Sequence, residues 1–311
     1  MEGNLMISIP EILTNNQELY GPIFVVGCPR SGTGVLARAI GLTESVCYLG
    51  ESKLISDYYV KWLPTPLAIY YWKNAENLLP ILKGKVRKLL DQINGRDPLK
   101  EALGYMLKLT RLTYDLKARN RPFLDKNNRK LDEQEMTFVN KLSDKYRQMS
   151  HYEIDKMLRI IFKDFQLLSG KAVMLEKTPA HALYIPTLQR IFPGAKVCHI
   201  VRDGRHVAAS YMLNYGQKKF DRKSMRHICR LHKRIRLIDE RLRKSQNPRY
   251  YSITYEDFIT SPATVLADLF KFLDLPLSES VLSAVKDVKP TPSNWSQLPS
   301  NAQKYVEGCL A

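Results

Sequence analysis

The sequence predicts an α/β fold, in which helices flank a parallel sheet. A short apolar run at 22–27, PIFVVG, ends in a turn containing Gly and Pro and leads into the helical segment VLARAI. Similar apolar runs recur further along the chain, at 171–175, 196–201 and 250–254. Helix-like sequence follows them, at 180–192, 204–216 and 261–273. This alternation favours parallel strands joined by helices. With 311 residues, 44% of them hydrophobic, the chain can bury a core of that size.

The middle of the chain breaks this alternation. Between about 52 and 170 the sequence consists of long stretches rich in Leu, Lys and Tyr without a convincing strand, punctuated by prolines. We expect a large helical insertion, or cap, within a single domain spanning 1–311.

A glycine-rich loop, Gly27 to Gly34, lies between the first strand and the first helix. Backbone amides and the helix dipole make this position an anion site, and the spacing resembles a Walker A loop. Thr33 stands where that motif has Lys, and Gly34 stands where it has the metal-binding hydroxyl. An ordinary metal-dependent nucleotidase is therefore disfavoured, whereas Arg30 can supply the missing positive charge. The fold class is thus the P-loop type of α/β fold.

Two motifs identify a resemblance. CPRSGT at 28–33, followed far downstream by VRDGRHVAAS at 201–210, resembles sulfotransferases that use 3′-phosphoadenosine-5′-phosphosulfate, in particular the bacterial and tyrosylprotein-sulfotransferase-like branch. The resemblance implies that the second motif binds the donor's 3′-phosphate through Arg202 and Ser210, and that Tyr255 lies near the adenine. It also implies that the first motif binds the 5′-phosphosulfate, without a metal, through Arg30, Ser31, Gly32, Thr33 and Gly34. Adenosine 3′,5′-bisphosphate would then be the product.

Two residues are candidates for the base that deprotonates the acceptor hydroxyl. Glu51 follows Arg30 by twenty-one residues, the interval at which the resembled branch places its catalytic Glu. His181 is the alternative, because a neutral imidazole can abstract a proton near pH 7. Lys177, in the segment EKTP, would stabilise the charge that develops on the leaving phosphate, and Arg30 would assist.

The chain carries a formal net charge of +17, much of it within 214–249. Apolar residues recur there at spacings of three and four, which predicts one helix with a buried stripe and a basic solvated face. Attraction of an anionic donor or acceptor is an alternative role for that face. Nucleic acid is disfavoured because no aromatic residues alternate with the charges.

Composition gives the predictions for the acceptor substrate and for the cellular location. Six aromatic rings between Asp57 and Trp72 would pack the core of the cap or line an apolar acceptor pocket, which favours a hydrophobic small-molecule hydroxyl; a peripheral membrane contact is an alternative. Five cysteines without a CxxC pair and a first segment without a basic n-region favour a cytoplasmic protein. Two other functions stay open: a phosphotransferase with a degenerate P-loop, and a non-catalytic binder of an acidic polymer.

Overall fold

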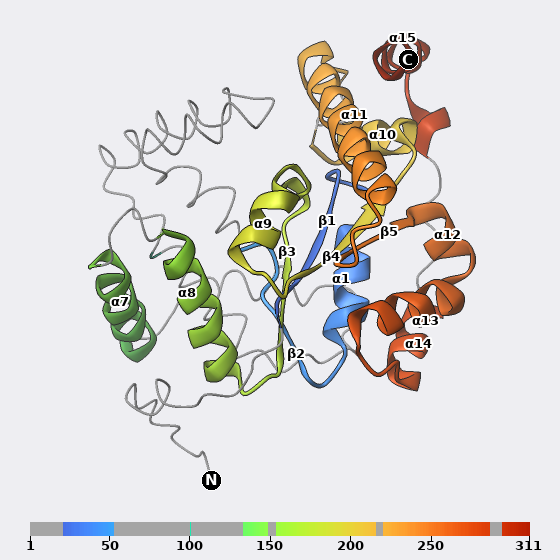
Figure 1. Ribbon diagram of the computed structural model, residues 1–311. Helices are drawn as coiled ribbons and strands as arrows, with labels where there is room; N and C mark the ends of the chain where they lie inside the picture. Colours follow the sequence, from blue (N-terminus) through green and yellow to red (C-terminus); the bar gives the residue numbers. More distant parts are fainter. Residues whose placement is uncertain (1–20, 53–99, 101–132, 149–153, 216–219, 287–293) are drawn as a thin grey trace. The chain divides into compact units, whose positions relative to one another are not determined.

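The structure is a computed structural model that describes residues 21–52, 100, 133–148, 154–215, 220–286 and 294–311 (Figure 1). The chain divides into two compact units. The first unit consists of Pro22–Ser52 and Leu175–Ala311, and the second of Met1–Gly21 and Lys53–Met174. The aromatic stretch 57–72 lies outside the described residues, and the single-domain organisation stays a prediction.

A five-stranded sheet in the order β2-β3-β1-β4-β5 forms the centre of the first unit. The strands are β1 (Ile23–Gly27), β2 (Val46–Tyr48), β3 (Val173–Lys177), β4 (Lys196–Val201) and β5 (Tyr250–Thr254). The pairings of β1 with β3, β1 with β4 and β4 with β5 are parallel, which confirms the α/β fold class. All five residues of β1 and of β3 are buried, as expected for strands covered on both faces.

The third strand differs from its prediction. The apolar run at 171–175 predicted the strand, but β3 begins at Val173 and continues through Glu176 and Lys177. Both charged side chains find partners inside the protein, so the strand extends beyond the point where apolar sequence stops. Lys177 is therefore the last residue of a strand rather than part of the loop after it.

Helices of the first unit cover both faces of the sheet (Figure 1). Helices α1, α13 and α14 pack together, while the short helix η4 contacts β1 and α11. The bounds are α1 (Thr33–Gly41), η4 (Pro179–Tyr184), α9 (Ile185–Ile191), α10 (Gly204–Tyr215), α11 (Arg222–Lys244), α12 (Tyr255–Thr260), α13 (Pro262–Leu273), α14 (Glu279–Lys286), η5 (Asn294–Gln297) and α15 (Ser300–Leu310). The helix expected at 180–192 is thus two helices, because Pro186 lacks the amide hydrogen that a continuous α-helix would need there.

Helix α11 confirms the expected basic helix but adds polar residues to its buried face. Met225, Ile228 and Ile235 are buried as predicted. His232 and Asp239 are buried beside them, and the Asp239 carboxylate accepts a hydrogen bond from the Tyr250 hydroxyl at 2.6 Å. Asp221 begins the helix by accepting hydrogen bonds from two backbone amides of the first turn.

Two helices of the second unit are described, α7 (Glu133–Arg147) and α8 (Ile154–Ser169). The Asp164 carboxylate on α8 joins them, because it accepts hydrogen bonds from Lys145 and Tyr146 on α7, each at 2.7 Å. Across the described residues, no helix is both long and apolar enough to cross a membrane.

Candidate functional site

The carboxyl end of each strand carries a residue that the sequence singled out. The phosphate loop follows β1, Glu51 follows β2, Lys177 ends β3, Arg202 follows β4 and Tyr255 follows β5. Carboxyl ends of parallel strands lie at the same edge of a sheet, and ligands of open α/β sheets bind at that edge. Parallel pairing of β1, β3, β4 and β5 therefore places the residues after these four strands along one edge, and the ion pair with Lys177 places Glu51 beside them.

Left-handed backbone shapes the phosphate loop. Arg30 has φ 76°, a conformation that non-glycine residues rarely adopt, and Gly32 has φ 99° at the start of α1. A Cβ atom on Gly32 would lie 2.5 Å from Cδ2 of Tyr255, so the Tyr255 ring packs directly against this glycine. Ser31 is fully buried, and its hydroxyl has no hydrogen-bond partner within the described residues. The loop therefore presents a strained turn and an unsatisfied hydroxyl, a combination that fits an anion cradle.

The next two loop residues differ in burial. The Thr33 side chain is 4% exposed and begins α1. Gly34 follows in the first turn, and a Cβ atom there would meet no other atom within 4 Å. The space beside Gly34 is therefore open.

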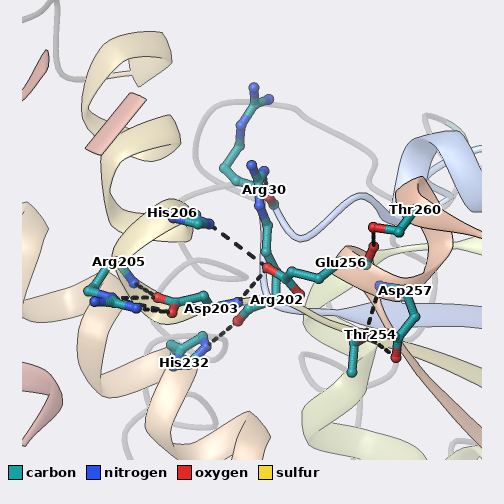
Figure 2. A network of polar contacts seen from close by, with 10 residues as sticks. All are labelled: Arg30, Arg202, Asp203, Arg205, His206, His232, Thr254, Glu256, Asp257 and Thr260. Carbon is teal, nitrogen blue, oxygen red and sulfur yellow. Dashed lines mark hydrogen bonds and ion pairs between the residues drawn. The ribbon is translucent and has the colours of Figure 1, made fainter. Parts of the chain in front are cut away.

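Arg202 connects the phosphate loop to β4, α10 and α12. Its side chain is buried, its Nη1 donates to the backbone oxygen of Arg30 at 3.1 Å, and its guanidinium lies 4.2 Å from the centre of the Tyr255 ring. The Nε of Arg30 in turn donates to the Ser210 hydroxyl at 3.1 Å. The structure thus brings together Arg30, Ser31, Arg202, Ser210 and Tyr255, which we call the β1/β4/β5 cluster (Figure 2 shows its two arginines).

The β1/β4/β5 cluster has unused capacity for an anion. The Nε atom of Arg202 is buried without a hydrogen-bond partner in the described part of the chain. Burial lowers the pKa of the Arg202 guanidinium, the Arg30 charge acts in the same direction, and Tyr255 and Glu256 oppose them. A bound phosphate or sulfate would satisfy the free N–H and favour the charged guanidinium.

Asp203 and Glu256 hold the turn that carries Arg202. Asp203 caps α10: its carboxylate accepts from the Arg205 amide at 2.8 Å and from the Arg205 side chain. The hydrogen bond from the Arg205 side chain lowers the pKa of Asp203 to about 2. The Asp203 amide donates to the Glu256 carboxylate at 3.2 Å, and His206 lies 3.9 Å from the same carboxylate oxygen (Figure 2).

A second group of polar residues gathers at the ends of β2 and β3. Lys177 donates to Glu51, so the candidate base and the candidate stabilising cation form an ion pair. The Glu51 side chain is 40% exposed, whereas that of Lys177 is 11% exposed. Glu51 is therefore open to solvent on one side and bound to a nearly buried ammonium group on the other.

Glu176, the residue before Lys177 in β3, has 0% exposure. Its carboxylate accepts hydrogen bonds from Ser52 and Thr178 and lies 3.0 Å from Nδ1 of His181. Burial alone would raise the pKa of Glu176, but His181 and these hydrogen bonds outweigh it and leave the pKa below its usual value. His181, the alternative base, is fully buried with Nδ1 directed at this carboxylate. We call this group the β2/β3 cluster: Glu51, Ser52, Glu176, Lys177, Thr178 and His181.

Sequence reasoning missed Glu176 and His232. A signal for Glu176 was present, because a carboxylate inside a strand with five buried residues needs internal partners. His232 had no such signal: its Nε2 lies 2.8 Å from the backbone oxygen of Arg202, which depends on how α11 packs. Within the described residues, no group of three or more His, Cys, Asp or Glu side chains is placed to hold a metal ion.

Comparisons with known proteins agree with the resemblance. A family model described as "Sulfotransferase family" matches residues 86–279, a range that includes Lys177, Arg202, Ser210 and Tyr255 but not the phosphate loop or Glu51. An uncharacterized protein of Aquifex aeolicus is 29% identical over 124 residues, 38% of this chain and 16% of that protein. Omega-hydroxy-beta-dihydromenaquinone-9 sulfotransferase Stf3 of Mycobacterium tuberculosis is 29% identical over 140 residues, 41% of this chain and 36% of Stf3.

Both matches therefore span much less than the length of these relatives. Among solved structures, the sulfotransferase domain from the curacin biosynthetic pathway aligns with 93% of this chain and 97% of that domain, at 17% identity and a TM-score of 0.47.

Proposed function

The chain belongs to the sulfotransferase family, and from that premise we propose that it transfers a sulfuryl group from 3′-phosphoadenosine-5′-phosphosulfate to a hydroxyl acceptor. One observation carries the proposal: the buried β1/β4/β5 cluster holds two polar groups, the Ser31 hydroxyl and the Arg202 Nε, that have no partner among the described residues. Buried polar groups are normally hydrogen-bonded, so unsatisfied donors beside a strained loop point to a ligand. Two arginines in the cluster make that ligand an anion.

The donor's two phosphate ends match the two halves of this cluster. The loop Arg30 to Gly34 would hold the 5′-phosphosulfate with its amides and hydroxyls, at the start of α1. Arg202 and Ser210 would hold the 3′-phosphate. The link from Arg30 to Ser210 joins the two subsites. Tyr255 would cover the nucleotide from the β5 side, since its ring already packs on Gly32 and the Arg202 guanidinium.

Chemistry would take place beside the Glu51–Lys177 pair. The acceptor oxygen attacks sulfur, its proton passes to Glu51, and the bond from sulfur to the 5′-phosphate oxygen breaks. Lys177 would stabilise the negative charge that develops on that oxygen. Of the two candidate bases, the accessible carboxylate of Glu51 suits this role better than His181, which is buried and directed at Glu176. His181 would instead hold Glu176 in place.

The acceptor we propose is the hydroxyl of a hydrophobic small molecule. The name of Stf3, which is similar to part of this chain, specifies an omega-hydroxylated dihydromenaquinone, which supports an apolar alcohol as the substrate class. The aromatic stretch 57–72, which we know from its sequence, would supply the apolar residues that such an acceptor requires.

Ligand binding without metal separates this function from its rivals. We expect adenosine 3′,5′-bisphosphate to raise the melting temperature with EDTA present, because saturation at 100 times its dissociation constant stabilises a protein by about 2.7 kcal/mol. ATP with Mg²⁺ should have little effect, since the loop lacks the lysine and the metal-binding hydroxyl. Greater stabilisation by Mg-ATP would favour a phosphotransferase, and no stabilisation by either nucleotide would favour a non-catalytic protein.

The base is tested by the pair Glu51→Gln and His181→Gln, with turnover measured on a long-chain alcohol. Glu51→Gln should lower kcat about 10²- to 10⁴-fold while the affinity for adenosine 3′,5′-bisphosphate stays nearly unchanged. Glu44→Gln, an exposed carboxylate shortly before β2, is the matched control. If His181→Gln abolishes turnover in a folded protein while Glu51→Gln retains it, the two roles must be exchanged.

A further inference from the structure

One face of α11 carries a row of exposed side chains, six of which are cations and one of which is apolar. Spacings of three and four residues keep side chains on the same side of a helix. The row consists of Lys223, Arg226, Arg230, Lys233, Leu237, Arg241 and Lys244, which we call the α11 stripe. All seven side chains are exposed, and at 1.5 Å per residue the stripe is about 32 Å long.

The two acidic residues of α11 do not neutralise the stripe. Asp239 lies on the opposite, buried face, where it binds the Tyr250 hydroxyl. Glu240 lies beside the stripe and pairs with Arg236 at 3.3 Å. Burial of Met225, Ile228 and other residues on the inner face fixes the orientation of the helix, so the six cations lie on its exposed side. Helix α15 borders one edge of the stripe: Arg226 donates to the Tyr305 hydroxyl at 3.1 Å, and Lys233 and Leu237 line a cavity that Glu240 and Glu307 also line.

An apolar residue interrupts the cations near the middle of the stripe. Leu237 is 50% exposed, more than any other large hydrophobic side chain in the described ranges, where Met136 at 42% is next. The stripe contains no aromatic residue on which a nucleic-acid base could stack. A flat anionic surface that also accepts an aliphatic side chain fits this combination better than a polar polymer does.

We propose that the α11 stripe docks the protein on bilayers rich in anionic phospholipid. Clusters of four to eight Lys and Arg attract such surfaces, each cation near the surface strengthening binding about fivefold, and Leu237 would enter the interfacial layer. This inference does not depend on the sulfotransferase reaction, because it rests only on α11.

Vesicle sedimentation tests the docking surface. We expect the protein to sediment with vesicles containing about 30% phosphatidylserine at roughly 0.15 M salt, and not with pure phosphatidylcholine vesicles. The double variant Arg230→Gln/Lys233→Gln should reduce the partition coefficient about 25-fold. The double variant Lys163→Gln/Lys271→Gln, which removes two exposed cations outside the stripe, should reduce it far less.

Leu237→Ser distinguishes a bilayer from an acidic polymer. We expect it to weaken vesicle binding and to leave retention on heparin or DNA unchanged. Equal binding to neutral and anionic vesicles would overturn the proposal. A second result would also overturn it: the parent protein binds heparin or DNA more tightly than vesicles, and Leu237→Ser changes neither binding.

An independent observation concerns the backbone of Arg202. His232 on α11 is 5% exposed, and its Nε2 lies 2.8 Å from the Arg202 carbonyl oxygen, which can only accept, so Nε2 donates (Figure 2). The imidazole also packs against Gly204, where a Cβ atom would lie 2.9 Å from the ring. The turn 202–204 is therefore held by α11 on the carbonyl side and by Glu256 of α12 on the amide side.

The geometry points to His232 as a positioning residue for the 3′-phosphate, an inference that rests on the proposed function. The readout is the ratio of affinities for adenosine 3′,5′-bisphosphate and adenosine 5′-monophosphate. His232→Leu should reduce this preference about tenfold, and His232→Gln, whose amide can donate from a similar place, should restore most of it. An unchanged preference in a folded His232→Leu protein would overturn the role. If the parent protein itself shows no preference for the bisphosphate, the proposed function fails instead.

Discussion

The two polar clusters at the carboxyl edge of the sheet contrast in how completely their groups are paired. In the β2/β3 cluster, Glu176 accepts from three side chains and Glu51 pairs with Lys177. In the β1/β4/β5 cluster, the Ser31 hydroxyl and the Arg202 Nε have no partner among the described residues, and cations outnumber carboxylates. Among the described residues, the carboxylates of the first cluster are paired, whereas we propose that an anion completes the second. Burial of polar groups thus accompanies internal pairing in one place and unsatisfied donors in the other.

The largest expected effect on stability is that of Glu176→Ala. Removing one partner of a buried ion pair typically costs about 3–5 kcal/mol, because the other polar groups lose their compensation. Denaturant unfolding should show a loss of that size, whereas Glu51→Ala, in the same cluster but 40% exposed, should cost less than about 1 kcal/mol. Similar losses in both variants would contradict the distinction between the buried and the exposed carboxylate.

The buried Glu176 carboxylate also predicts that the stability of the protein depends on pH. Because the folded-state pKa of Glu176 lies below its usual value, its stabilisation is complete above the usual carboxyl pKa and is lost as the pH falls through the lowered pKa. The Glu176→Ala protein should therefore lose less stability on acidification than the parent, as measured by unfolding at a series of pH values.

Arg202→Ala tests the incomplete cluster. The free energy of binding adenosine 3′,5′-bisphosphate should weaken by about 1.5–3 kcal/mol, the range for a charge-assisted hydrogen bond. The free energy of binding adenosine 5′-monophosphate should change little. Isothermal titration calorimetry measures both. Arg205→Ala, an exposed arginine that Asp203 holds, is the control and should leave both affinities nearly unchanged. Equal losses for both nucleotides would make Arg202 a structural residue.

Asp203→Ala tests how much the turn after β4 contributes to stability, independently of ligand binding. Loss of the α10 cap should cost about 1 kcal/mol of unfolding free energy near pH 7. The Arg205 hydrogen bond lowers the pKa of Asp203 to about 2, so this contribution should persist above about pH 4 and fade as the pH falls toward 2. The difference in stability between variant and parent should shrink over that range, and a constant difference would argue against the carboxylate as its source.

Gly34→Ala should have the smallest effect, and it should stabilise. A Cβ atom at this position meets nothing within 4 Å, so the substitution should raise the unfolding free energy by about 0.4–1 kcal/mol by restricting the unfolded chain. Gly34→Thr provides the comparison: it adds a hydroxyl to the loop and should in addition tighten binding of the bisphosphate. A destabilised Gly34→Ala protein would show that the space beside α1 is not free.

The sequence by itself determined the alternation of β1, β3, β4 and β5 with helices, and most of the residues at the carboxyl edge, but the predicted apolar runs did not include β2. Strong local signals made this feasible: β4 and β5 match the apolar runs at 196–201 and 250–254, and the loop after β1 carries its own glycine pattern. Local patterns were insufficient where tertiary contacts override them, as when β3 extends over Glu176 and Lys177, or when Pro186 divides the helix expected at 180–192.

Only the tertiary structure decided how these residues are paired. Lys177 and Glu51 lie 126 positions apart in the chain, and Arg30 and Ser210 lie 180 apart, so no periodicity relates them. Parallel strand pairing brings their elements to one edge, and packing of α11 and α12 sets the partners of the Arg202 backbone. Sequence patterns report the local preferences of strands and helices, whereas the burial of a charge and the choice of its partner depend on contacts between distant segments.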